Sequence, residues 1–159
     1  MKTDDENRAP ILANKHFGAP SVFTPESLLR EARRQKEAPE QAVPPICLLD
    51  PDGDILWHLK ASGHARRHEG WVCYHTELFV FEEGSVELGI IGCVVGASFA
   101  VLVAEELFAL GCELLISVTS SGQLDPVRPP PYFILIELTL RDERHQLPLP
   151  ATVTLQRST

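Results

Sequence analysis

The chain has 159 residues, of which 44% are hydrophobic and 23% are charged, and its formal net charge is −8. This length predicts one domain with a hydrophobic core, and the apolar content excludes a wholly disordered chain. The acidic balance argues against nucleic acid as a partner, because phosphate backbones require clustered Lys and Arg, and the only basic clusters are short, at 30–36 and 64–68.

The cysteines and the apolar runs bear on the cellular compartment and on whether the chain has a membrane span. The four cysteines are widely spaced, form no C-x-x-C pair and mostly lie in apolar runs, so we expect a reducing, cytoplasmic setting. Residues 1–8 are polar and acidic, unlike a signal peptide. The uncharged run 89–104 is too short for a membrane span and contains Gly92 and Gly96, so it predicts a strand, a turn and a helix start.

Residues 1–42 are expected to form an arm, a helix and a Pro-rich linker. Thr24 is a predicted N-cap and Pro25 the first helical residue of a helix that runs to about Lys36. The linker, 38–45, contains three prolines and overlaps a strand predicted over 43–49. The acidic turn 50–54 follows and resembles the start of a calcium loop, but no Glu closes a twelve-residue loop, so a polar turn is favoured.

Another short element is predicted to start at 55–59, and a basic segment comes after it. His64 and His68 would lie on one face of a helix and could bind zinc there. No third ligand is evident, and Arg66 and Arg67 between them would repel a cation. A solvated basic face is therefore the favoured interpretation, with an anion-facing patch as the other alternative.

The second half of the chain alternates between strand and helix patterns. Segments 77–81 and 86–92 flank a turn and predict a β-hairpin. A helix is predicted over 98–110, with Ser98 as N-cap and Gly111 as the residue that ends it. Strands are predicted over 114–118, which is fully apolar, and over 132–140, after three prolines.

The stretch 86–118 is thus a β–turn–α–β unit with parallel strands. Its continuous apolar strands predict a sheet covered on both faces, with ligands at the carboxyl ends of the strands. The loops at those ends, 93–97 and 119–123, offer hydroxyls, backbone N–H groups and a helix N-terminus. They predict a site for a small polar ligand that is anionic or sugar-like, with an ordinary turn as the alternative.

Four segments carry a family resemblance when read in order: 89–97 (GIIGCVVGA), 104–107 (AEEL), 110–112 (LGC) and 118–122 (VTSSG). They resemble the nucleoside phosphorylase family, the uridine and purine nucleoside phosphorylases. The resemblance covers roughly 43–143 and is strongest across 86–125. It implies a three-layer α/β/α fold with a mixed central sheet. It also implies a pentosyltransferase that uses inorganic phosphate as co-substrate to cleave a nucleoside into base and ribose 1-phosphate.

The resemblance also implies site residues in two loops. Ser120 falls on the family's phosphate-binding Thr, and the implied phosphate or ribose contacts are Gly96, Thr119, Ser120, Ser121 and Gly122. A first phosphate loop falls on Asp50, Pro51, Asp52 and Gly53, and it keeps Asp-Pro but lacks the family's leading Gly and its Arg.

Other family arginines are also missing. One falls on Ser117, and another falls near Tyr74, where Arg66 or Arg67 could substitute. No organic cofactor and no metal is expected, and the catalytic residues stay unassigned. Because hydrolytic nucleosidases share the fold and do not need these arginines, hydrolysis is the alternative reaction.

The C-terminal residues depart from the family. The sequence of residues 144–159 does not resemble the family. We hypothesise that a one-base frameshift after Glu143 produced this tail, with a natural short variant as the alternative. The domain at 43–143 would then be incomplete at its C-terminus and weakly active or inactive. Expected partners are a nucleoside and, as in the full-length family, further copies of the chain, with no nucleic acid and no membrane. A non-catalytic nucleoside-binding or interaction module and an unrelated doubly wound domain are the remaining alternatives.

Overall fold

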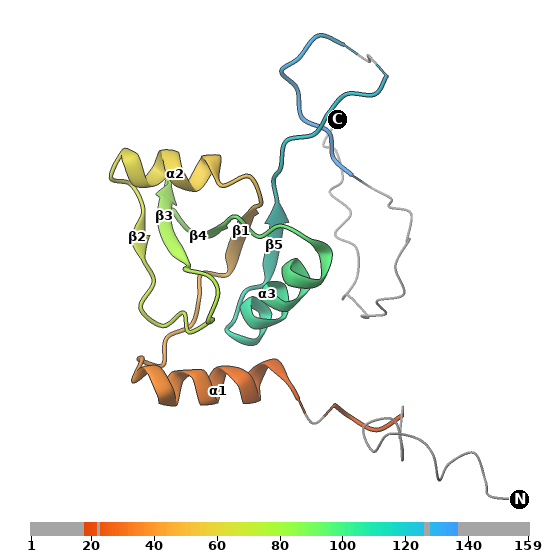
Figure 1. The fold of residues 1–159 in the computed structure, drawn as a ribbon. Helices are drawn as coiled ribbons and strands as arrows, with labels where there is room; N and C mark the ends of the chain where they lie inside the picture. Colours follow the sequence, from red (N-terminus) through yellow and green to blue (C-terminus); the bar gives the residue numbers. More distant parts are fainter. Residues whose placement is uncertain (1–17, 22, 126–127, 137–159) are drawn as a thin grey trace, which may run out of the picture.

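The chain forms a mixed α/β structure around one open sheet in a computed structural model that describes residues 18–21, 23–125 and 128–136 (Figure 1). Within these ranges the sheet has five strands in the order β2-β3-β4-β1-β5. Their bounds are β1 Ile46–Asp50, β2 Arg66–Arg67, β3 Phe79–Glu83, β4 Val86–Gly92 and β5 Leu114–Ser117. Strand β1 lies between β4 and β5 and pairs in parallel with both, whereas β2 with β3 and β3 with β4 pair antiparallel.

Helix α1 (Pro25–Lys36) begins and ends as the sequence predicts. The Thr24 hydroxyl accepts a hydrogen bond from the Ser27 backbone N–H at 3.3 Å, and Pro25 lacks the N–H that would otherwise be unpaired. The helix stops at Glu37, whose φ of 51° is left-handed. Leu29 and Ala32 are its buried residues.

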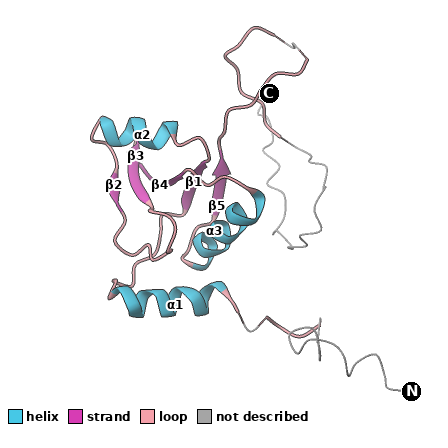
Figure 2. Cartoon of the chain, in the orientation of Figure 1, coloured by secondary structure: helices cyan, strands magenta, loops and turns pink. Residues whose placement is uncertain are grey.

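The other two helices are α2 (Asp54–Ala61) and α3 (Ala97–Ala109) (Figure 2). The short element expected after residue 54 is thus a helix of two turns. The prediction that Ser98 caps α3 is wrong, because the helix starts one residue earlier at a Gly96 N-cap that makes no side-chain capping bond. The predicted end is confirmed, since Gly111 has φ +103° and follows the C-cap residue.

The predicted hairpin is confirmed as β3 and β4, with Glu83 opposite Val86. The parallel β–turn–α–β unit is also confirmed, although β4 and β5 are not neighbours, because β1 lies between them. The run 89–104 contains the end of β4, a turn and the start of α3, as predicted. No helix in the described part of the chain is both long and apolar enough to cross a membrane.

Two apolar clusters use alternate residues of β1, which point to opposite faces of the sheet. Cys47 and Leu49 pack with Leu107 of α3 in the larger cluster. Leu48 packs against the cluster that contains Leu56 of α2 and Ile90 of β4. All four cysteines are free, and Cys93 is the exposed one.

Three strand predictions are wrong in part. Residues 114–117 of the predicted strand 114–118 form β5, but among the described residues β5 is an edge strand that pairs with β1 alone, and Ile116 is 41% exposed. The expected continuous burial therefore does not hold there. Residues 132–136 of the expected strand 132–140 are not in a strand, and Phe133 is 91% exposed. The chain leaves the sheet after β5 as a loop (Figure 2), and residues 137–140 lie outside the described ranges, as does the tail 144–159. β1 starts at Ile46 rather than at residue 43, after prolines that lack a backbone N–H.

The zinc alternative required His64 and His68 to lie on one helix, and the structure forms no helix at these residues. The two histidines flank the short strand β2, and His68 is buried with its Nε2 within 3.0 Å of the Ala42 carbonyl oxygen. Arg66 and Arg67 are exposed, as a solvated basic face requires, and they pair with Glu87 and Glu77. No cluster of three or more metal-ligating side chains occurs among the residues that the structure describes.

Candidate functional site

Three loops meet at one edge of the sheet, because each follows the carboxyl end of a parallel strand. They are residues 51–53 after β1, 93–96 after β4 and 118–122 after β5. The Cys93 N–H donates to the Asp50 carbonyl at 2.8 Å, which ties the β4 loop to the β1 loop. The Val118 N–H donates to the Leu49 carbonyl at 2.9 Å, which ties the β5 loop to the same strand. We call these segments the three-loop site.

The topology makes this edge the natural place for a ligand. From β1 the chain passes through α2 toward β2, β3 and β4, whereas from β4 it passes through α3 to β5 on the other side of β1. The two connections therefore leave adjacent parallel strands in opposite directions. In open α/β sheets, ligands bind in the crevice outside the carboxyl ends of strands at such a reversal.

Asp50 is a structural member of the three-loop site. Its carboxylate is buried, with 1% of the residue exposed, and accepts the Gly53 N–H at 3.1 Å and the Leu56 N–H at 2.9 Å. Both oxygens thus hold the loop and the first turn of α2 in place. Asp50 therefore organises the site rather than facing a ligand.

Asp52 joins the two loops that the sequence singled out. Its exposed carboxylate accepts the Thr119 hydroxyl at 3.3 Å and also accepts the Ser120 backbone N–H. Hydrogen bonds lower the pKa of Asp52, and the one from the Ser120 N–H has the largest effect. The hydroxyls of Ser120 and Thr119 act in the same direction. The carboxylate is therefore kept ionised beside the residue that was expected to contact phosphate.

This arrangement decides which ligand groups suit the loop. A second anion next to Ser120 would be repelled by Asp52 and would compete with it for the same N–H donor. A ligand hydroxyl, in contrast, can donate to the carboxylate in a charge-assisted hydrogen bond. The β5 loop thus favours a polyhydroxy ligand over a phosphate.

Close backbone approach holds the β1 and β4 loops together. Gly53 has φ +83°, and a Cβ atom built on it would lie 2.8 Å from the Cys93 sulfur. A Cβ on Gly92 would lie 2.9 Å from the Leu56 side chain and 3.6 Å from the Gly53 Cα. A side chain at either position would require Cys93 or Leu56 to move, so glycine suits both positions with the loops as they stand.

The remaining residues that the sequence marked for this site make no hydrogen bond to Asp52 in the described part of the chain. Gly96 starts α3 with φ +99°, and the space around its Cα is open. Ser121 and Gly122 are exposed. Hydrogen bonds between the loops, in the part of the chain that is described, involve Thr119 and Ser120 but not these three residues. Pro51 is half-buried between Asp50 and Asp52.

A hollow of about 330 Å³ adjoins the three-loop site, and no sequence motif predicted it. It lies between α2 and the segment 74–77, and Gly92 at the end of β4 forms part of its wall. Its other linings include Lys60 and His75, which no motif had marked. Lys60 follows Leu56 by four residues, so both side chains lie on one face of α2.

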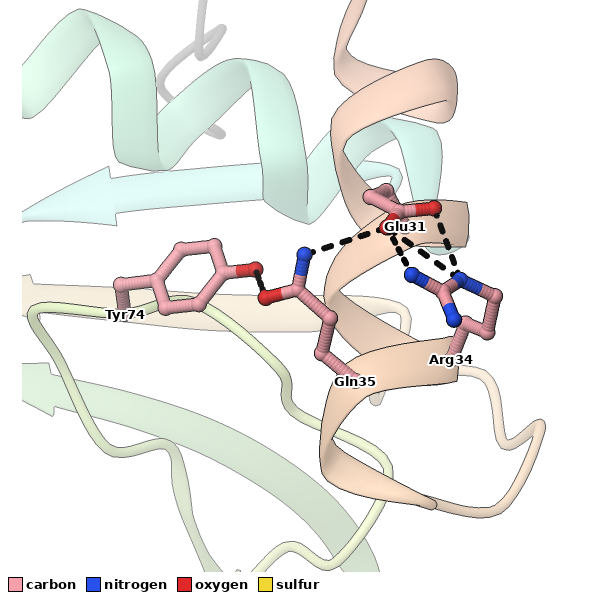
Figure 3. Close-up of polar contacts among 4 residues, drawn as sticks. All are labelled: Glu31, Arg34, Gln35 and Tyr74. Atoms are coloured by element: carbon pink, nitrogen blue, oxygen red, sulfur yellow. Dashed lines mark hydrogen bonds and ion pairs between the residues drawn. The ribbon is translucent and has the colours of Figure 1, made fainter.

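Helix α1 fixes the segment 74–77 from behind (Figure 3). The Tyr74 hydroxyl donates to the Gln35 side-chain oxygen at 2.8 Å, and the Gln35 amide donates to Glu31 at 3.1 Å. Arg34 also binds Glu31, and its hydrogen bond lowers the Glu31 pKa to about 2. The Lys36 ammonium donates to the Cys73 carbonyl at 2.8 Å.

One buried acid lies near the same segment. Glu106 of α3 is only 2% exposed, and its Oε2 has no hydrogen-bond partner in the structure as described. Burial raises the pKa of Glu106, although its neighbours Cys73, His75 and Lys36 act in the opposite direction. Its position in the middle of α3 buries it away from the three-loop site.

No protein-family model, curated protein or solved structure matches the chain. Its site is therefore characterised by its own geometry, namely three loops at a reversal of the sheet, a carboxylate that bridges two of them, and an adjoining hollow.

Proposed function

We propose that the chain is a nucleoside phosphorylase-like protein that binds a nucleoside at the three-loop site. The observation that carries the proposal is the contact of Asp52 with Thr119 and Ser120. This contact brings together two loops that are far apart in the sequence and that the family resemblance separately implies as substrate loops.

The ribose is the part of the nucleoside that this chemistry suits. Its hydroxyl groups can donate to the Asp52 carboxylate and to the hydroxyl oxygens of Thr119 and Ser120, whose own protons are directed at Asp52. Backbone N–H groups of the same loop add further donors. A neutral sugar is not repelled by the acidic loop, whereas a phosphate at this point is.

The proposal includes a three-layer α/β/α arrangement whose sheet is incomplete beyond β5. Packing of α2 and α3 against alternate residues of β1 supports the layers. Among the described residues, β5 has no strand on its outer side, Ile116 is 41% exposed, and the apolar residues 133–136 are exposed, which supports this part of the proposal. Weak activity, or binding without turnover, is the expected consequence.

Hydrolysis is the second candidate reaction, and the position of Asp52 favours it. A phosphorylase must hold phosphate next to the sugar, but the Ser120 N–H is already engaged by a carboxylate. The loops after β1 and β5 carry no arginine at the positions where the family has one. A nucleosidase, which uses water in place of phosphate, needs neither group. If the same site binds a nucleoside without cleaving it, the chain is a non-catalytic nucleoside-binding module.

The test is a base-release assay with inosine and uridine, in the presence and absence of inorganic phosphate, combined with calorimetric measurement of nucleoside binding. Phosphate-dependent release supports the phosphorylase, phosphate-independent release supports the nucleosidase, and binding without release supports the module. Asp52→Asn and Ser120→Ala should weaken binding, whereas Ser85→Ala, in the hairpin turn at the far end of β4, should not. Absence of both release and binding would refute the proposal.

A further inference from the structure

The hollow between α2 and the segment 74–77, here called the β4 pocket, is lined by both apolar and hydrogen-bonding side chains. Its volume is about 330 Å³, within the lower range of small-molecule pockets. The side chains that matter for the argument are Leu56, Lys60, His75, Thr76, Glu77 and Phe79. They place an apolar floor, Leu56 and Phe79, beside groups that can donate hydrogen bonds.

The charge of the β4 pocket is opposite in sign to that of the chain. Lys60 lies with its ammonium 4.3 Å from the centre of the Phe79 ring, and it takes part in no ion pair among the described residues. Glu77, the acid in the lining, is offset by Arg67 at 3.4 Å. Lys60 is thus left as an uncompensated positive charge in a protein whose formal net charge is −8.

Three residues of the lining carry hydrogen-bond donors. Lys60 supplies its ammonium and His75 a ring N–H. The Thr76 hydroxyl accepts the Trp71 indole N–H at 3.0 Å and is also hydrogen-bonded to Cys73, so a ligand must compete with the Cys73 sulfur for its proton. The Tyr74 hydroxyl, in contrast, already donates to Gln35 on α1 (Figure 3).

The donors are held before any ligand arrives. The Trp71 indole also donates to the Thr76 carbonyl at 3.2 Å, and the His75 ring packs edge-on against Phe99 of α3, with ring centres 6.4 Å apart. Lys36 fixes the preceding Cys73 carbonyl. Groups that are fixed in advance lose little entropy on binding, so exposed donors of this kind can still hold an anion.

We propose that the β4 pocket binds a phosphate group through Lys60, His75 and Thr76, either as free phosphate or as the phosphate of a small organic monoester. A tetrahedral phosphate offers several acceptor oxygens to three separate donors, and lysine binds it as a point charge. The apolar floor accepts the organic part of a monoester. The inference does not depend on nucleoside binding at the three-loop site, because the two sites use different side chains.

The first experiment titrates inorganic phosphate and phenyl phosphate into the ¹⁵N-labelled protein and follows backbone amide shifts. Saturable shifts at residues 60, 75 and 76 are expected, with phenyl phosphate binding more tightly because of Leu56 and Phe79. Absence of saturable shifts up to roughly 20 mM ligand would overturn the proposal, since even a site with a dissociation constant of about 1 mM is almost saturated at that concentration.

Variants then locate the bound group. Lys60→Met and Thr76→Val should each lower the affinity about fivefold or more, and Lys60→Arg should restore most of the loss. Arg34→Met, which removes an exposed cation on α1, is the matched control and should have no effect. Equal affinities for Lys60→Met and Arg34→Met would overturn the proposal.

Ser120→Ala separates this inference from the proposed function. In the β4 pocket, phosphate affinity is unchanged by Ser120→Ala. If Ser120→Ala abolishes phosphate binding while Lys60→Met leaves it intact, the anion binds at the three-loop site and the inference is wrong. Failure of nucleoside binding with normal phosphate binding would refute the proposed function alone.

Discussion

Replacing Gly53 with alanine tests how closely the loops after β1 and β4 approach each other. At this position φ is +83°, a left-handed conformation that costs an L-residue about 1–2 kcal/mol. The new Cβ would also lie 2.8 Å from the Cys93 sulfur, closer than van der Waals contact allows. Overpacking of this kind costs about 1–3 kcal/mol, so the free energy of unfolding should fall by about 2–5 kcal/mol in total.

Gly84→Ala separates the two contributions. Gly84 has φ +61° in the hairpin turn, and no atom lies within 4 Å of a Cβ built there. Its replacement should therefore cost only the conformational part, about 1–2 kcal/mol. The double variant Gly53→Ala/Cys93→Ala removes the sulfur and should recover about 1–3 kcal/mol relative to Gly53→Ala.

Urea unfolding, followed by tryptophan fluorescence and circular dichroism, measures all four proteins. Trp57 is a suitable probe, because its ring lies 3.5 Å from the position of the new Cβ. If Gly53→Ala costs no more than Gly84→Ala, and if removal of the Cys93 sulfur restores nothing, then the two loops do not approach as described.

Three further substitutions probe the acids of the structure. Asp50→Ala leaves the Leu56 N–H without its acceptor, whereas the Gly53 N–H keeps the Asp50 backbone carbonyl, and it should lower the free energy of unfolding by about 1–3 kcal/mol, measured by the same urea assay. Hydrogen bonds lower the pKa of Asp52, so its contribution to stability is present above the ordinary value of 3.8 and is lost as the pH falls through the lowered pKa. Asp52→Asn should therefore flatten the acid side of the curve of melting temperature against pH, and an unchanged curve would contradict the contact with Ser120. Burial raises the pKa of Glu106, so the folded state is most favoured below the ordinary value of 4.5 and loses this advantage as the pH rises through the raised pKa. Glu106→Gln should remove that decline and should be more stable than the unaltered chain at pH 7 in thermal unfolding. A lower stability at pH 7 would show that the ionised acid is needed. Glu105→Gln is the control for the loss of one carboxylate from α3.

The parts of the fold that depend on nearby residues could be predicted from the sequence. Thr24 and Pro25 define the start of α1 because a cap acts on N–H groups within the first turn. The hairpin and the C-terminal end of α3 follow equally from local signals, such as a turn between alternating runs and Gly111 after the last helical turn.

The burial of a strand, in contrast, depends on its neighbours. The apolar segment 114–118 predicts a buried strand, yet β5 lies at the edge of the sheet with Ile116 exposed. The same composition would suit a central strand, so only the strand order distinguishes the two. His68 is buried beside Ala42 for a similar reason, since its partner is 26 positions away in the sequence.

The sequence predicted that the loops 93–97 and 119–123 share one edge of the sheet, but not that the acidic turn contacts the Ser-rich loop there. The acidic turn and the Ser-rich loop were each marked by their residues, but their junction at Asp52 spans 68 positions and results from the register of β1 with β5. The β4 pocket was missed because Lys60 and His75 belong to no motif and come together only through the packing of α2 beside the segment 74–77.

The most direct test of the nucleoside site is an NMR titration of the ¹⁵N-labelled chain with inosine or uridine. The account predicts saturable shifts of the backbone amides of residues 52–53, 93–97 and 119–122, with loss of those shifts in Asp52→Asn. Shifts confined to other parts of the chain, or no saturable shift with either nucleoside, would contradict the three-loop site as the place where the ligand binds.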